Sequence, residues 1–414
     1  MAKTTLPMDT TDSLTTAPHE PNIAGVPRNV FMLSIVSCFA DISGEMIYPL
    51  IPIFLTSVLG APVAVVGLIE GIAESTASLV KVFSGWWSDR TKRRKPLVIG
   101  GYGLAVLGKL LLAIAFVWPM ALVARFVDRF GKGMRGSPRD ALIADSASEN
   151  ERGRAFGFHR SMDTLGAVIG PLLGLLLVAL LHDRLRVVFA LAIIPGLLSV
   201  AALALVRESR PKAAKKTPPP KISLAGFDPR FRLFLLASII FALGNSSDVF
   251  LILRAKQLGL STTAVVLAYV LYNFVYMGAA LPAGIRSDKG SRRGLLVVGL
   301  LIFAAVYAGF ALITRSVFIW PLFAVYGLYI ALTDGVTKAL IVDLVPADRR
   351  ATAIGIYGTA TGIAAFIASV TAGVLWDRVS TAAPFVLGAV GALIGAFLLF
   401  LVLPRSPETA PRAA

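Results

Sequence analysis

Long apolar segments, separated by short polar connections, dominate the pattern of the chain. Each segment holds about twenty residues, which is enough for a helix to cross the roughly 30 Å hydrocarbon core of a bilayer. We therefore expect an all-α membrane protein with twelve transmembrane helices. Their predicted ranges are 30–56, 62–85, 97–117, 119–145, 155–181, 186–206, 231–253, 262–284, 294–313, 317–343, 349–375 and 383–403.

The polar connections alternate between basic and nearly neutral sequences. The basic set consists of SDRTKRRKP, SENERGR, RESRPKAAKKTPPPK, SDKGSRR and PADRR. Because cytoplasmic loops of membrane proteins carry an excess of lysine and arginine, this set predicts the cytoplasmic side. Both chain ends then lie in the cytoplasm, as polar tails at 1–26 and 405–414, and we expect the protein in the cytoplasmic (inner) membrane of a bacterium.

The composition supports a membrane protein and argues against several other classes. Hydrophobic residues make up 56% of the 414 positions and charged residues 15%, which is too apolar for a soluble chain of this length. The net charge of +16 follows from the basic loops, so no nucleic-acid partner is expected. One cysteine and three scattered histidines offer neither a metal site nor a nucleophile with its base, so we expect no cofactor and no enzymatic activity.

Two sequence patterns recur at a nearly constant distance. The charged sequence GWWSDRTKRRK at 85–95 returns 199 positions later as GIRSDKGSRR at 284–293. The sequence ALIAD at 141–145 returns 198 positions later as ALIVD at 339–343. These repeats predict two homologous halves, at 27–206 and 229–404. The Lys-, Pro- and Ala-rich stretch 207–228 is the expected cytoplasmic linker between them.

At these charged repeats the chain resembles the major facilitator superfamily of secondary transporters, whose motif between the second and third helix reads G-x-x-x-D-R-x-G-R-R. Thr91 and Lys92 stand where the family usually has a glycine, and Lys289 replaces an arginine in the second copy. The resemblance implies two six-helix bundles related by a pseudo-twofold axis, a monomer, and alternating access to a midplane substrate site. It also implies a conformational latch of Gly85, Asp89, Arg90, Arg93, Arg94, Asp288 and Arg292.

Acidic residues occur where the bilayer should exclude them. Asp41 and Glu45 in the first helix are four positions apart and share one face with Tyr48. A carboxylate within hydrocarbon costs several kcal/mol unless it is paired, hydrated or protonated. Both acids are therefore candidate proton carriers, with Glu45 preferred because it lies deeper. The alternative is a structural ion pair with a basic residue on a neighbouring helix.

A second acidic pair, Glu70 and Glu74, lies in the second predicted helix. Two like charges one turn apart repel each other, which favours protonation of at least one of them. They form either a second proton station or the ion-pair partners of the fourth helix.

The fourth predicted helix is the most highly charged. Its ionic side chains fall within about 120° of one another on the helix wheel; they are Arg125, Asp128, Arg129, Lys132, Arg135 and Arg139. Seven acids oppose eight bases in the membrane helices of this half, so we favour interlocked ion pairs over a cage for an anion.

This helix also resembles the R-x-x-Q-G-x-G motif of many exporters of the superfamily. The resemblance assigns Arg125 the place of an arginine implicated in proton transfer, although Asp128 replaces the glutamine and Arg129 replaces a glycine. The full set predicted to take part in proton coupling is Asp41, Glu45, Glu70, Glu74, Arg125 and Asp128.

Small residues mark the fifth predicted helix. Their spacing resembles the g-x8-G-x3-G-P-x2-G antiporter motif of drug and metabolite exporters. Leu175 stands where a second glycine usually follows the last one of this motif. Small residues allow helix backbones to approach, and a proline bends the helix. The alternative is ordinary small-residue packing without any role in export. The motif residues are Gly157, Gly166, Gly170, Pro171 and Gly174.

The second half offers polar and aromatic residues instead of charges. Tyrosines can contact the apolar body of a ligand and hydrogen-bond its edges, although tyrosines at helical spacing can equally be packing residues. Asp334 and Lys338, four positions apart, are expected to pair. The predicted substrate cavity comprises Arg129, Lys132, Asn245, Asp248, Tyr269, Asn273, Tyr276 and Tyr326.

Taken with the resemblance, these features predict a transporter that couples proton entry to efflux of a small drug-like or metabolite substrate by alternating access. Its partners are then the substrate, protons and the lipid bilayer. One alternative is uptake of an organic anion or a metal chelate through the basic cavity. Another is a signalling or scaffold protein with a transporter fold, for which an appended soluble domain would be expected.

Overall fold

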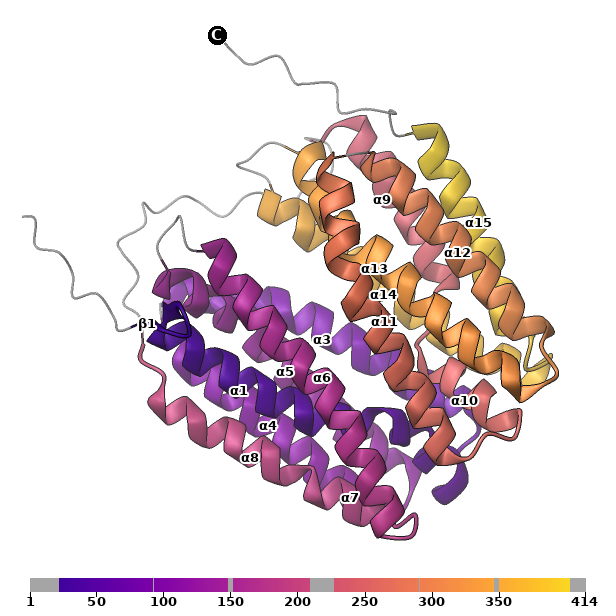
Figure 1. The fold of residues 1–414 in the computed structure, drawn as a ribbon, viewed down its shortest axis with the longest axis horizontal. Helices are drawn as coiled ribbons and strands as arrows, with labels where there is room; N and C mark the ends of the chain where they lie inside the picture. The colour runs from indigo at the N-terminus through magenta and orange to yellow at the C-terminus, as the bar shows by residue number, and fades with distance from the viewer. Residues whose placement is uncertain are drawn as a thin grey trace, which may run out of the picture.

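The computed structural model describes residues 22–91, 93–147, 152–208, 227–289, 291–345 and 350–402. Two helical bundles lie side by side, the first coloured indigo to magenta and the second pink to yellow in Figure 1. The main helices of the first bundle are α1 (Arg28–Glu45), α3 (Val63–Thr91), α4 (Lys95–Ala113), α5 (Trp118–Ser146), α6 (Arg152–Leu180), α7 (Leu185–Leu191) and α8 (Ile193–Ala202). Those of the second are α9 (Pro229–Gly244), α10 (Val249–Gln257), α11 (Thr262–Lys289), α12 (Arg292–Leu312), α13 (Ile319–Leu344), α14 (Arg350–Arg378) and α15 (Ala383–Val402).

Eleven described helices are long and apolar enough to cross a membrane. The one predicted span missing from these eleven is the fourth, α5, because it contains more charged residues than an apolar membrane helix. It has 29 residues, as α3 does, and packs along both α3 and α4. The bundle partners therefore surround the charged stripe, and twelve spans agree with the prediction.

Three spans are broken, although the sequence pattern predicts continuous segments. The first is α1, which ends at Glu45 and continues through a 3₁₀ turn (Tyr48–Leu50), α2 (Ile51–Ile53) and a π-helical turn (Phe54–Val58). Pro49 and Pro52 explain this irregularity, because proline donates no backbone hydrogen bond and clashes with the preceding turn.

The sixth span divides between α7 and α8, and the seventh breaks between α9 and α10. Residues 245–248 of the seventh span, NSSD, have short polar side chains that compete with helical backbone hydrogen bonds. The break brings non-helical backbone into the middle of the bundle.

Residues 22–26, the end of the expected polar tail, form a small hairpin with Pro27. Strand β1 (Asn22–Ile23) pairs antiparallel with β2 (Val26–Pro27), and the turn residues Ala24 and Gly25 have positive φ angles of 52° and 78°. Val26 is buried against the first bundle. Hydrophobic anchoring of this one residue explains why the chain is ordered before the first span.

The two halves contact each other at the end opposite the basic loops. Helices α3 and α14 run close together there, where the Ala64 N–H donates to Asp377 Oδ2 at 2.7 Å and Ser75 Oγ donates to the Gly362 carbonyl at 3.2 Å. A side chain at Gly67 would collide with the Ser369 carbonyl. Glycine at this position lets the two backbones touch.

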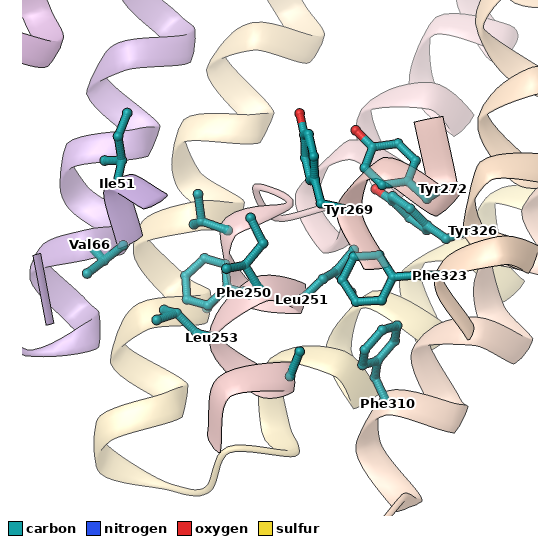
Figure 2. Close-up of a cluster of buried hydrophobic side chains, with 14 of the residues drawn as sticks. Ile51, Val66, Phe250, Leu251, Leu253, Tyr269, Tyr272, Phe310, Phe323 and Tyr326 are labelled. Atoms are coloured by element: carbon teal, nitrogen blue, oxygen red, sulfur yellow. The ribbon is translucent and has the colours of Figure 1, made fainter. Parts of the chain in front are cut away.

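Buried apolar side chains fill the space between the halves at this end. Figure 2 shows Ile51 and Val66 from the first half facing Phe250, Leu251 and Leu253 from α10, with aromatic rings behind them. We call this group, with Phe310 and Phe323, the apolar plug. Its members are at most 6% exposed, so this end of the molecule is closed.

Candidate functional site

A cavity of about 1010 Å³ lies between the halves on the side of the basic loops. Helices α3 and α5 line it from the first half, and α9, α12, α13, α14 and α15 line it from the second. Its deep end reaches Asn245, Asp248 and Tyr326, next to the apolar plug. Its other end reaches Lys81 and Lys338, near the basic connections.

The break in the seventh span forms the deep end of the cavity. Asp248 accepts hydrogen bonds from the hydroxyls of Tyr326 at 2.6 Å and Tyr272 at 3.3 Å. The neighbouring Ser247 N–H donates to Ser369 Oγ at 3.2 Å, which fixes the non-helical backbone. In the described part of the chain no lysine or arginine forms an ion pair with Asp248.

Glu45 connects the two halves. Its Oε2 accepts a hydrogen bond from the Tyr269 hydroxyl at 2.9 Å, although the two residues are 224 positions apart in the chain. The rings of Tyr48 and Tyr269 also meet across the interface, with centroids 5.6 Å apart. None of the described bases pairs with Glu45, so the alternative of a structural ion pair finds no partner among them.

Glu70 and Arg125 form a buried ion pair. Arg125 donates from Nε at 3.0 Å and from Nη2 at 2.7 and 2.8 Å to the carboxylate, and the two side chains are 5% and 0% exposed. Asp128 lies 3.7 Å from Arg125 and 3.3 Å from Lys109 Nζ. Arg125 is thus held by two acids at once.

Glu74 pairs with Arg129 at 3.3 Å, and its side chain is 46% exposed to the cavity. Of the two interpretations of Glu70 and Glu74, the structure shows the ion pairs with the fourth predicted helix. These pairs are the interlocked network that the charge balance predicts.

Part of the stripe on α5 has other surroundings. Arg135 stacks on the ring of Tyr102 at 4.1 Å, and Arg139 donates to Ser37 Oγ at 2.8 Å and pairs with Asp140 at 3.0 Å. A second, polar hollow of about 40 Å³ is lined by Asp41, Glu45 and Lys132, among others. Neither Asp41 nor Lys132 forms an ion pair with a described residue.

The glycines of α6 face α1 at the turns that carry the two acids. A Cβ added at Gly166 would lie 2.9 Å from Asp41 Cβ, and one at Gly170 would lie 2.9 Å from Glu45 Cβ. Gly174 faces Met46 in the same way, and Pro171 lies inside the helix. Small residues here let α6 hold α1 close, as the packing argument predicts. The surroundings of Gly157 lie outside the described part.

The predicted substrate residues of α11 do not line the main cavity. Tyr269 contacts Glu45 instead, and Asn273 Nδ2 donates to the Tyr269 carbonyl at 3.0 Å within its own helix. The Tyr276 hydroxyl accepts a hydrogen bond from Arg160 Nη2 at 3.0 Å and donates one to Asp334 Oδ2 at 3.3 Å. The reason is the orientation of α11 about its axis, which turns the face with these three residues toward the first half rather than into the main cavity.

Asn245, Asp248 and Tyr326 do line the main cavity, whereas Arg129 and Lys132 line the smaller one. Lys338 Nζ lies 3.0 Å from Asp334, as their spacing predicts. Several aromatic residues that line the cavity could not be predicted from the sequence, because an aromatic residue within a helix gives no indication of the direction in which its side chain points. They are Trp86, Phe234, Phe241 and Tyr357.

The predicted latch arginines make the same contact in each half. Arg94 donates to the Ala141 carbonyl at 2.8 Å and pairs with Asp145. In the second half, 198 positions later, Arg292 makes the equivalent contacts: it donates to the Ala339 carbonyl at 2.8 Å and pairs with Asp343. Each arginine therefore ties the start of one helix to the end of the next helix in its own bundle.

The remaining latch positions have separate environments. Gly85 faces Ser137 of α5, Arg90 lies 5.4 Å from the ring of Trp86, and Arg93 is exposed. The side chains of Asp89 and Asp288 lie outside the described part.

The repeated contacts and the paired bundles agree with comparisons to known proteins. The model of the Major Facilitator Superfamily matches residues 33–254 and 233–414. This chain belongs to the major facilitator superfamily. An uncharacterised transporter of the same type from Methanocaldococcus jannaschii is 34% identical over 390 residues, covering 93% of this chain and 97% of that protein.

This major facilitator is also similar to the multidrug resistance protein MdtH of Aeromonas salmonicida, with 24% identity over 92% of this chain and 96% of that protein. Among solved structures, a POT family transporter in complex with 5-aminolevulinic acid has a TM-score of 0.77 at 13% identity, over 92% of this chain and 97% of that one. A D-xylose-proton symporter has a TM-score of 0.75 at 18% identity, over 92% and 100%. The structural neighbours share the fold, and membership of the superfamily makes the chain an integral membrane transporter with the predicted twelve-helix fold.

Proposed function

We propose that this major facilitator exports a small drug-like or metabolite substrate in exchange for protons, across the cytoplasmic membrane of a bacterium. The observation that carries the proposal is the Glu45 carboxylate, which joins the two halves through Tyr269 and has no basic partner among the described residues. By the positive-inside rule we assign the basic loops, and with them both termini, to the cytoplasm. The cavity then opens toward the cytoplasm and the apolar plug closes the periplasmic side.

The acids of the first half divide into two groups by their partners. Glu70, Glu74 and Asp128 each face an arginine or lysine, which stabilises the charged form. Among the described residues Asp41 and Glu45 have no such ion-pair partner, and both line the smaller polar hollow, so their carboxylates are free to exchange a proton. We therefore assign proton exchange to Glu45, with Asp41 one turn away as its neighbour.

The hydrogen bond from Tyr269 can couple this proton to the movement of the halves. A hydrogen bond to a carboxylate is about twice as strong as one to a neutral group. The ionised Glu45 thus stabilises contact between α1 and α11, and protonation weakens it. In this scheme, release of the proton from Glu45 to the cytoplasm restores the contact and holds the empty carrier open to the cytoplasm until substrate binds.

Two features support efflux rather than uptake. The glycine and proline pattern of α6, which packs against the acid-bearing face of α1, resembles the motif of antiporters. A relative of this chain is named a multidrug resistance protein. Uptake of an anion through a basic cavity is less well supported, because Lys109, Arg125 and Arg129 are each paired with acids.

Proton release inside vesicles tests the proposal without a labelled substrate. The purified protein is reconstituted with pyranine inside the vesicles, and a panel of drugs and metabolites is added under an imposed pH difference. We expect at least one compound to accelerate proton movement, and Glu45→Gln to remove this acceleration. Asp140→Asn makes the same charge change at an acid paired with Arg139 outside both cavities and should retain it. If no compound in the panel accelerates proton movement, or if Glu45→Gln leaves the acceleration unchanged, proton exchange through Glu45 is refuted.

A further inference from the structure

The acids that line the main cavity differ in how they are neutralised. Glu74 pairs with Arg129 at 3.3 Å, and Asp334 pairs with Lys338 at 3.0 Å. Asp248 has two tyrosine hydroxyls as donors and no basic partner among the described residues. The deep end of the cavity therefore holds a carboxylate without a described basic partner, and a cation bound beside it would stabilise its ionised form.

Aromatic rings line the cavity from Asp248 toward its outer end. Tyr326 and Tyr329 lie with centroids 5.4 Å apart, and the ring of Phe241 meets Tyr329 at 6.2 Å. All three line the cavity, as do Phe234 and Tyr357, whose neighbouring rings stack at 5.9 Å with planes 12° apart. The face of an aromatic ring attracts a cation within about 6 Å of its centroid, so these rings add to the attraction of the carboxylate.

Two helix ends of opposite polarity meet at the break beside Asp248. Helix α9 has 16 residues and ends at Gly244, and Phe241, Ala242 and Asn245 from its last turn and cap line the cavity. The carboxyl end of a helix carries a partial negative charge and favours a cation. Asp248 is the N-cap residue of α10, whose amino end favours an anion, but its carboxylate makes no capping hydrogen bond there and accepts hydrogen bonds from Tyr326 and Tyr272 instead.

The basic residues of the cavity lie too far away to neutralise Asp248. Lys338 follows Tyr326 by twelve residues on α13, which is about 18 Å along the helix axis. It is also bound to Asp334. Lys81 is exposed near the same outer end, where water screens its charge. The deep end of the cavity thus offers a carboxylate, whereas the end near the basic connections offers the bases Lys81 and Lys338.

We propose that the exported substrate is an organic cation, whose positive group binds beside Asp248 and whose apolar body lies against the aromatic rings. This inference rests on the proposed function and names the substrate class of the same cavity. A volume of about 1010 Å³ accommodates a drug-sized molecule. An anion would meet an attractive charge at Lys81 but a repulsive one at the deep end.

Two probes of equal shape and opposite charge test the inference directly. Tetraphenylphosphonium and tetraphenylborate are titrated into the protein in lipid nanodiscs at fixed pH, with empty nanodiscs subtracted. We expect the cation to bind at least tenfold more tightly than the anion. Asp248→Asn should weaken binding of the cation at least tenfold, and Asp248→Glu, which keeps the charge, should restore most of it.

Asp228→Asn is the matched control, because it makes the same charge change in the same span. Asp228 caps the other end of α9, where asparagine is an equally good cap, and it lies outside the cavity. Its affinity for the cation should stay within twofold of the unmodified protein. The inference would be overturned if tetraphenylborate bound as tightly as the cation or more tightly. It would also be overturned if Asp248→Asn bound the cation within twofold of the unmodified protein. If the asparagine variant does not fold, binding of the cation by Asp248→Glu is the deciding measurement.

The binding measurement needs no gradient, so it separates the two proposals. Selective binding of the cation without transport driven by a pH difference would retain the cation site and refute proton exchange. Proton-driven movement of a neutral or anionic compound, without charge-selective binding, would retain the exporter and refute the cation site.

Discussion

Replacing Glu70 by glutamine tests whether the buried acids of α3 are structural partners. The substitution keeps the shape of the side chain and one hydrogen-bond acceptor but removes the charge that faces Arg125. Both side chains are almost fully buried, at 0% and 5% exposure, so water cannot replace the lost carboxylate. Removing one partner of a buried ion pair costs about 3–5 kcal/mol, because the other charge stays buried and uncompensated.

The structure indicates the lower end of this range. Asp128 lies 3.7 Å from Arg125 and continues to offset part of its charge after the substitution. We therefore expect a loss of about 3 kcal/mol in the free energy of unfolding, which is roughly a hundredfold change in the equilibrium constant. Glu74→Gln is the comparison one turn away: its own side chain is 46% exposed, although Arg129 is only 9% exposed, so its loss of stability should be smaller than that of Glu70→Gln.

Equilibrium unfolding in mixed detergent micelles measures both variants, with tryptophan fluorescence as the signal. Proton-coupled flux is measured on the same preparations. The reasoning is wrong if Glu70→Gln unfolds like the unmodified protein. Unchanged stability together with lost proton coupling would identify Glu70 as a proton carrier instead of a structural partner.

Three further predictions concern other contacts. Glu45→Gln should leave the fold intact and lower pH-driven export at least tenfold in proteoliposomes; unchanged export would remove Glu45 from the mechanism. Gly170→Ala should lower stability by about 1–3 kcal/mol, because its Cβ would overlap α1, whereas Gly103→Ala meets no atom within 4 Å and should change little; equal thermal denaturation of the two would contradict this. Arg94→Ala should destabilise the protein roughly 1 kcal/mol more than Arg292→Ala, because its ion pair is more buried, and detergent unfolding that shows the reverse order would argue against the burial argument.

Contacts between neighbouring segments of one half could be predicted from the sequence. Arg94 and Arg292 sit at equivalent places in two repeats, and their partners Asp145 and Asp343 recur at the same distance. A charged helix such as α5 must find acids nearby, which is why ion pairs with the second span could be foreseen. The sequence left open which acid would bind which base, because Glu70 and Glu74 are both within reach of the α5 stripe.

Contacts between the halves could not be predicted in this way. Glu45 and Tyr269 are 224 positions apart, and their hydrogen bond depends on how two separately packed bundles meet. The rotation of α11 likewise directed Tyr269, Asn273 and Tyr276 away from the main cavity, although all three share one helix face. Helical spacing shows which residues share a face but contains no information on which neighbour that face meets.

By itself, the sequence of this protein determined the twelve spans, the repeat, the side of the basic loops and the unusual acids. These follow from the thickness of the bilayer, from charge and from periodicity, which act on local segments. Only the tertiary structure decided that Glu70 forms an ion pair, whereas Glu45 and Asp248 have no basic partner among the described residues, and that the seventh span breaks beside the cavity. Those outcomes depend on the docking of distant surfaces, where burial and neighbouring charge act together.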